Sequence, residues 1–119
     1  MGVSYIRSGT VQLIQKWVKT ATAAISTSIP KQGRPWAILE VRLHLSAAGG
    51  AAENFSLTIN SGDGAEYDTP LLAQNMNAVQ SLVWIPDTPH VLFPDDALDI
   101  AYVNTNTRTY GLTIVYEVL

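Results

Sequence analysis

Apolar and polar positions alternate along most of the chain. Leu98, Ile100 and Tyr102 fall on one face of the segment that ends at Tyr102, with polar and small residues between them. The same period of two runs through residues 112–118. Successive side chains of a β-strand point to opposite faces, so this pattern predicts half-buried antiparallel strands.

Four further segments show strand patterns, and residues 36–46 alternate most regularly. Small and β-branched residues alternate over residues 20–29, and shorter runs cover 55–59 and 79–85. If the alternation continues through each segment, the apolar positions form the core. The predicted core is Leu39, Val41, Leu43, Leu45, Phe55, Leu57, Ile59, Leu98, Ile100, Leu112, Ile114 and Tyr116.

Turn-forming residues separate these segments. Proline ends the strand patterns at Pro30, at Pro86–Pro89 and at Pro94, and the residues of 60–64 tolerate positive φ. The result is about six to eight short strands with no βαβ alternation. We therefore predict an all-β fold, an antiparallel β-sandwich of the jelly-roll kind, as a single domain over residues 1–119.

The first eighteen residues fit a strand or a helix, and we favour a strand because everything after them alternates. This segment contains Tyr5, Ile6, Ile14 and Trp17, an apolar content that no evident strand pairing within the domain explains. We therefore predict that residues 1–18 form an N-terminal arm that lies against a neighbouring subunit, with Trp17 as its anchor.

Residues 79–85 are apolar on both faces of the predicted strand. Val83 and Ile85 alternate with Leu82 and Trp84. Such a strand either lies between two layers or exposes one face to a partner. Leu82 and Trp84 join the four N-terminal residues as the candidate interface.

Composition supports an interacting surface. Apolar residues make up 47% of the 119 residues and charged residues only 14%, against about 25% in typical soluble domains. The net charge is −3, with no dense basic run, so we expect no nucleic-acid binding. Cysteine is absent, no apolar run is long enough to span a membrane, and the N-terminus lacks the apolar core of a signal peptide. We expect a protein made in the cytoplasm that needs no membrane.

Residues that could support catalysis or metal binding have simpler explanations. His44 and His90 lack metal-ligand spacing, and we interpret both as strand histidines. The acidic groups of residues 63–68 and 95–99 lie in predicted turns, where Asp accepts hydrogen bonds from its own backbone. A calcium loop at Asp63, Glu66 and Asp68, or a carboxylate pair among Asp95, Asp96 and Asp99, is the less favoured alternative. We predict no catalytic residue, no cofactor and no metal site.

The arrangement from Pro35 onward resembles a known family. Pro35-Trp36 is followed by two alternating segments, a proline-rich break, the acidic turn of residues 94–96, a further strand, and a return through Tyr110-Gly111. This order is similar to that of the small jelly-roll virion proteins of tailed bacteriophages, of the capsid decoration or cement type.

The resemblance implies a non-enzymatic structural role. Its expected partners are the major capsid protein and further copies of the chain, most often as trimers, and its expected location is the capsid surface of the virion. The alternative is a host- or carbohydrate-binding module of a phage fibre or tail, for which Trp36, Tyr67 and Tyr110 are the candidate exposed aromatics.

Overall fold

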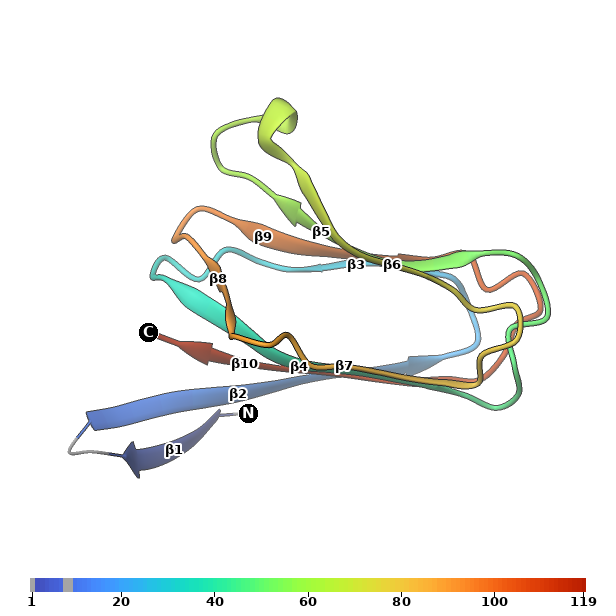
Figure 1. The fold of residues 1–119 in the computed structure, drawn as a ribbon, viewed down its shortest axis with the longest axis horizontal. Coiled ribbons are helices and arrows are strands. Elements are labelled where there is room, and N and C mark those ends of the chain that lie inside the picture. The colour runs from blue at the N-terminus through green and yellow to red at the C-terminus, as the bar shows by residue number, and fades with distance from the viewer. Residues whose placement is uncertain (1, 8–9) are drawn as a thin grey trace.

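The computed structural model describes residues 2–7 and 10–119, and side chains from Leu13 onward. The fold is all-β: two antiparallel sheets face each other across one apolar core (Figure 1). The prediction of an all-β, β-sandwich-like fold is therefore confirmed. One short 3-10 helix, η1 (Ala65–Tyr67), is the helical element of the described residues.

The larger sheet contains β1 (Gly2–Arg7), β2 (Thr10–Ala21), β10 (Tyr110–Val118), β4 (Trp36–Leu45) and β7 (Ser81–Trp84) in this order, and β8 (His90–Leu92) continues the β7 side of β4. The smaller sheet contains β3 (Ile25–Ile29), β9 (Ala97–Tyr102), β5 (Asn54–Asn60) and β6 (Thr69–Asn75) in this order.

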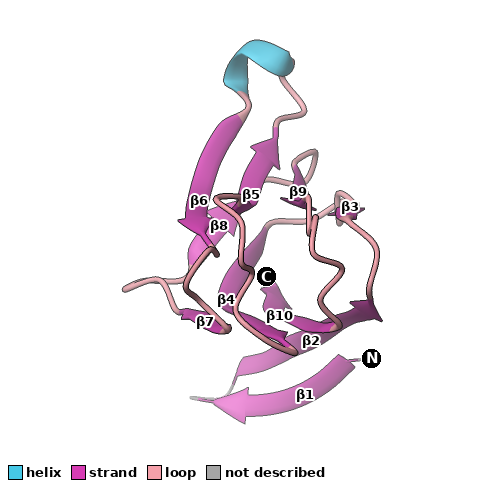
Figure 2. Ribbon diagram, turned by 90° about the vertical axis from the view of Figure 1, so that its right-hand side faces the viewer, coloured by secondary structure: helices cyan, strands magenta, loops and turns pink. Residues whose placement is uncertain are grey.

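The chain passes from one sheet to the other at most of its connections. Only β1–β2, β5–β6 and β7–β8 are consecutive strands within one sheet. As a result β2 and β3 lie at one lateral side of the two-sheet body, and β6 and β7 lie at the other (Figure 2). The β5–β6 connection, which carries η1, projects away from the body (Figure 1).

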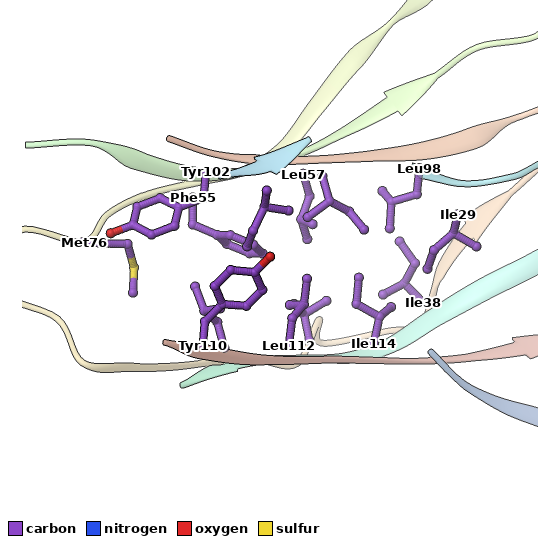
Figure 3. Close-up of a cluster of buried hydrophobic side chains, with 14 of the residues drawn as sticks. Ile29, Ile38, Phe55, Leu57, Met76, Leu98, Tyr102, Tyr110, Leu112 and Ile114 are labelled. Atoms are coloured by element: carbon purple, nitrogen blue, oxygen red, sulfur yellow. The ribbon is translucent and has the colours of Figure 1, made fainter. Parts of the chain in front are cut away.

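Side chains from both sheets meet in the core (Figure 3). Nine of the twelve predicted core residues are buried there, among them Phe55, Leu57, Leu98 and Leu112. Ile59 and Tyr116 are only partly buried but pack against the same cluster. The sequence pattern missed eight members of the core, which are Ile25, Ile29, Trp36, Ile38, Met76, Leu92, Tyr102 and Tyr110.

The assignment of Leu39 to the core is wrong, because β4 contains a bulge. Val115 of β10 pairs with Glu40, but the next residue, Tyr116, pairs with Ile38, so Leu39 is an extra residue without a partner. A single extra residue reverses the alternation of a strand. Trp36 and Ile38 therefore face the core before the bulge, and Val41 and the later odd-numbered residues face it afterwards.

Contacts of Trp36 hold the first residues of β4, before the bulge, in place. Its indole N–H donates a hydrogen bond to the carbonyl oxygen of Asp96 at 3.3 Å, and its ring meets that of Tyr116 edge-on at 5.2 Å. A buried tryptophan needs both apolar contact and a partner for its N–H. Both requirements are met only with Trp36 inside.

The N-terminal segment forms two strands, β1 and β2, which pair with each other, so the premise that it has no pairing within the domain is wrong. β2 pairs with β10 over nine positions, from Leu13↔Val118 to Ala21↔Tyr110. The strand predicted over residues 20–29 is in fact two, because β2 ends at Ala21 and β3 begins in the other sheet at Ile25.

The bulge leads to a direct test of the core assignment. Ile38→Ala should lower the free energy of unfolding by about 2–5 kcal/mol, because it leaves a cavity in the core. Leu39→Ala, one residue away, should cost about 1 kcal/mol or less, since that side chain is half exposed. Urea unfolding of both variants measures the difference. A larger loss for Leu39→Ala than for Ile38→Ala would show that β4 runs without the bulge.

Candidate functional site

The six predicted interface residues do not form one exposed surface. Trp17, Leu82 and Trp84 are partly buried and pack against the core. Their part in an interface stays a prediction. Ile14 is half-buried on β2, opposite Glu117 of β10. Tyr5 and Ile6 belong to β1, and their side chains lie outside the described residues.

Four of the exposed apolar side chains lie instead along the other face of β7 and β8 or directly after these strands. Strand alternation turns Leu82 and Trp84 inward, and it turns Val83 and Ile85 outward, where 59% and 63% of each is exposed. The sequence correctly identified a strand that is apolar on both faces. It did not reveal which face the second sheet covers, because both alternating sets are equally apolar.

The same outward face continues along β8. Val91 is 48% exposed and Phe93, which follows the strand, is 68% exposed, whereas Leu92 between them is buried. β7 and β8 pair with the same edge of β4, one after the other: β7 with residues 41–44 and β8 with residues 36–38. We call Val83, Ile85, Val91 and Phe93 the apolar row. Exposed apolar groups that cluster at a sheet edge are typical of interaction surfaces.

The N-terminal hairpin is a second exposed feature. β1 pairs with residues 10–15 of β2, and β10 reaches only as far as the pair Leu13↔Val118. Residues 10–12 of β2 therefore pair with β1 alone. The hairpin extends past the end of β10, away from the other strands (Figure 1).

Asp96 has a structural role. Its carboxylate accepts hydrogen bonds from the backbone N–H groups of Phe93 at 3.0 Å and Gly62 at 3.2 Å. The prediction that this aspartate accepts a hydrogen bond from the backbone of its own turn is confirmed. The contact with Gly62 also joins the β8–β9 turn to the β5–β6 connection. Asp99 accepts a hydrogen bond from the Ser28 hydroxyl at 2.6 Å, and Asp95 is exposed.

The acidic residues of the β5–β6 connection serve the loop itself. Asp68 accepts a hydrogen bond from the backbone N–H of Ser61 at 2.9 Å, and Asp63 and Glu66 are exposed. In the part of the chain that the structure describes, no three acidic or histidine side chains come together as a metal site would require. His44 is exposed and hydrogen-bonded to the Ser81 hydroxyl at 2.6 Å, and His90 is half-buried in β8.

The aromatic residues proposed for carbohydrate binding do not gather at the surface. Trp36 and Tyr110 are buried in the core, so their assignment to an exposed patch is wrong. Tyr67 of η1 is 63% exposed. Sugar stacking needs an exposed aromatic face, which of these three only Tyr67 offers.

Polar side chains cross-link the loops at the end of the sandwich opposite the hairpin. The Asn104 side-chain amide donates to the carbonyl oxygens of Thr22 and Arg108, and its own oxygen accepts from the Arg108 N–H, each at 3.0 Å. Arg108 Nε donates to the carbonyl oxygen of Ala48 at 2.9 Å. Glu53 accepts from the backbone N–H and the hydroxyl of Thr105. These groups satisfy one another, which is the arrangement of a structural network.

Two tyrosine hydroxyls lie beneath this network. In the described part of the chain, the hydroxyls of Tyr102 and Tyr110 are buried without a hydrogen-bond partner (Figure 3). Burial raises the pKa of both residues above the usual 10.0, and for Tyr102 the nearby Glu53 raises the pKa further while Arg108 opposes it. The raised pKa means that these hydroxyls ionise at a higher pH than an exposed tyrosine does.

Comparison with known proteins adds no relative. No protein-family model matches the chain, and no curated protein is similar to it in sequence. Among the described residues, no helix is long and apolar enough to cross a membrane.

The role of Asp96 can be tested against its neighbour. Asp96→Ala should lower the free energy of unfolding by about 1–3 kcal/mol, because two backbone N–H groups lose their acceptor. Asp95→Ala is the matched control and should change it by less than about 0.5 kcal/mol, since that side chain is exposed. Thermal or urea unfolding measures both, and similar values for the two variants would contradict the assignment.

Removal of a buried tyrosine hydroxyl, unlike removal of the Asp96 carboxylate, should not destabilise the protein. Tyr110→Phe should leave the free energy of unfolding unchanged or raise it by about 1 kcal/mol, because an unsatisfied buried hydroxyl is removed. Tyrosines in the unfolded chain ionise near pH 10.0, before the buried ones, so stability should fall as the pH rises above that value. The variant should lose less stability there than the wild type. A large loss on Tyr110→Phe at neutral pH would show that the hydroxyl has a partner.

Proposed function

We propose that the protein is a non-enzymatic structural component of a tailed-bacteriophage particle, a capsid decoration protein with jelly-roll topology. The expected partner is the major capsid protein, and the expected location is the capsid surface of the virion. The strand order, the projecting hairpin and the low charge content support this proposal.

The strand order supports the topology. An eight-stranded jelly roll has strands 1, 8, 3 and 6 in one sheet and strands 2, 7, 4 and 5 in the other. With β2 counted first and β8 treated as a continuation of the β7 edge, the sheets read β2-β10-β4-β7 and β3-β9-β5-β6. These orders correspond to the jelly-roll arrangement, with β1 as an additional strand outside it.

The projecting hairpin is the observation that carries the proposed function. β1 lies at the edge of the larger sheet and extends with β2 past the end of β10. An edge strand offers backbone N–H and C=O groups to another chain, and proteins that avoid such pairing block the edge with proline or lysine. The β1 sequence, GVSYIR, has neither.

Attachment by strand addition explains how such a protein would act. The hairpin would add its edge to a sheet of the shell protein, and backbone hydrogen bonds would provide affinity. Because only the assembled shell offers the site, binding would stabilise the shell by mass action. The fibre-module alternative is less well supported, since two of its three candidate aromatics are buried.

Removal of the hairpin edge tests this function. Deletion of residues 1–9 should leave the two-sheet body folded, because β2 still pairs with β10 through residues 13–21. It should abolish co-sedimentation with phage shells prepared without the protein. Asp63→Ala, on the projecting β5–β6 connection, is the control and should attach normally.

Trp17→Ala separates attachment from folding. Trp17 packs against the core, so its loss should lower the free energy of unfolding by about 2 kcal/mol or more without a direct effect on attachment. A truncated protein that still occupies shells fully would overturn the role of the hairpin.

A further inference from the structure

The larger sheet offers two adjoining strand edges on its hairpin side. β1 pairs with residues 10–15 of β2, and none of the described strands pairs with the outer edge of β2 from Lys16 to Ala21. Alternate residues of such an edge direct their backbone N–H and C=O groups away from the sheet, where a strand of another chain can pair with them. Strand addition is therefore geometrically open both at β1 and at residues 16–21 of β2, which we call the open stretch.

Both lysines of β2 lie in the open stretch. Residues 10–15, which β1 covers, contain no charged residue, whereas the open stretch contains Lys16 and Lys19. Strand alternation places these two side chains on opposite faces of the sheet. A strand that paired with the open stretch would therefore meet a positive charge on each of its faces.

Lys19 lies on the core-facing side of β2. It pairs with Leu112 of β10, which is buried, and it shares its face with Trp17, which packs against the core. The Lys19 side chain is half-buried. A charged residue that points inward from an edge strand is one of the means by which β-proteins prevent edge-to-edge pairing.

The described surroundings offer Lys19 no carboxylate. Residues 10–30, which include β2 and β3, contain no Asp or Glu, and the ion pair among the described side chains joins Arg42 to Glu40. An added strand would remove water from the Lys19 ammonium, and burial of an unpaired charge is strongly unfavourable. Lys16 is exposed on the outer face and can stay hydrated, so the larger penalty comes from Lys19.

The other described sheet edges are protected in different ways. Pro70 lies within β6, Pro86 and Pro89 separate the short strands β7 and β8, and β3 ends next to Pro30. Proline and short length both hinder strand addition at an edge. β1 contains neither proline nor lysine, and its one charged residue, Arg7, is the last of the strand. β1 is thus the least protected of these edges.

We propose that Lys16 and Lys19 are specificity-determining residues, which keep other chains off the open stretch and so confine strand addition to β1. This inference deepens the proposed function and rests on it, because β1 is the edge assigned there to attachment. The lysines act by exclusion: they make an alternative pairing unfavourable and need no contact with the partner that β1 binds.

Neutralisation of the two lysines tests the inference. Lys16→Thr with Lys19→Thr removes both charges and introduces residues that favour strands. The variant should form growing assemblies at a concentration at least about tenfold lower than the wild type requires, a factor equivalent to about 1.4 kcal/mol. Light scattering over a dilution series measures this concentration. Lys19→Thr alone should produce most of the shift, since Lys19 is the charge that points inward.

Two matched variants control for charge. Lys31→Thr with Arg34→Thr removes the same amount of positive charge from the exposed β3–β4 loop and should behave as the wild type does. Lys16→Arg with Lys19→Arg keeps both charges and should also behave as the wild type does. Hydrogen exchange locates the contact, because backbone amides of residues 16–21 should gain protection in the assemblies of the neutral variant.

Two results would overturn the inference. One is a neutral variant that is folded by circular dichroism but assembles only at the wild-type concentration. The other is an assembly in which the amides of residues 16–21 exchange as fast as in the dispersed protein. If the double variant does not fold, Lys19→Thr alone decides the question by the same measurements.

The outcomes distinguish this inference from the proposed function. Shell binding that requires residues 1–9, together with a neutral variant that stays dispersed, would refute the role of the lysines and leave attachment by β1 standing. Assembly of the neutral variant, together with full shell binding by the truncated protein, would support the role of the lysines and count against attachment by β1.

Discussion

The structure depends on the burial of one apolar face of each sheet against the other. Each strand has two faces, and only the face toward the second sheet gains the hydrophobic free energy of about 25 cal/mol per Å² removed from water. Every other feature must accommodate this constraint. The bulge at Leu39 keeps Trp36 and Val41 on the same buried face, although their positions in the sequence have opposite parity. The carboxylate of Asp96 then holds the turn under which the indole of Trp36 lies.

This constraint also determines which apolar side chains and strand edges remain exposed. The core takes Leu82 and Trp84, so Val83 and Ile85 must face outward, and β8 repeats the arrangement with Leu92 inside. At the other lateral side, β1 is too short to cover β2 fully, which leaves the edge from Lys16 onward open.

Several polar residues that the sequence offers as candidate functional groups form hydrogen bonds within turns and loops of the structure. Asp96 caps a turn, Asp68 closes its own loop, and Asn104 links the β2–β3 connection to the β9–β10 loop. Tyr102 and Tyr110 pack in the core, where burial raises the pKa of their hydroxyls. Such residues attract attention in a sequence because they are polar and clustered. The hydrogen-bond partners of Asp96, Asp68 and Asn104 are backbone groups, so these side chains hold loops and turns in place.

The sequence by itself determined the all-β class, most strand positions and the acidic turn, because alternation and turn chemistry are local properties. Tertiary structure decided which face of each strand is buried. The bulge at Leu39 and the inward direction of Trp17 and Trp84 depend on pairing with strands far away in sequence, to which a local pattern has no access. The same reason explains the apolar row. Val83 and Leu82 are alike as residues, and only the position of the second sheet makes one of them surface and the other core.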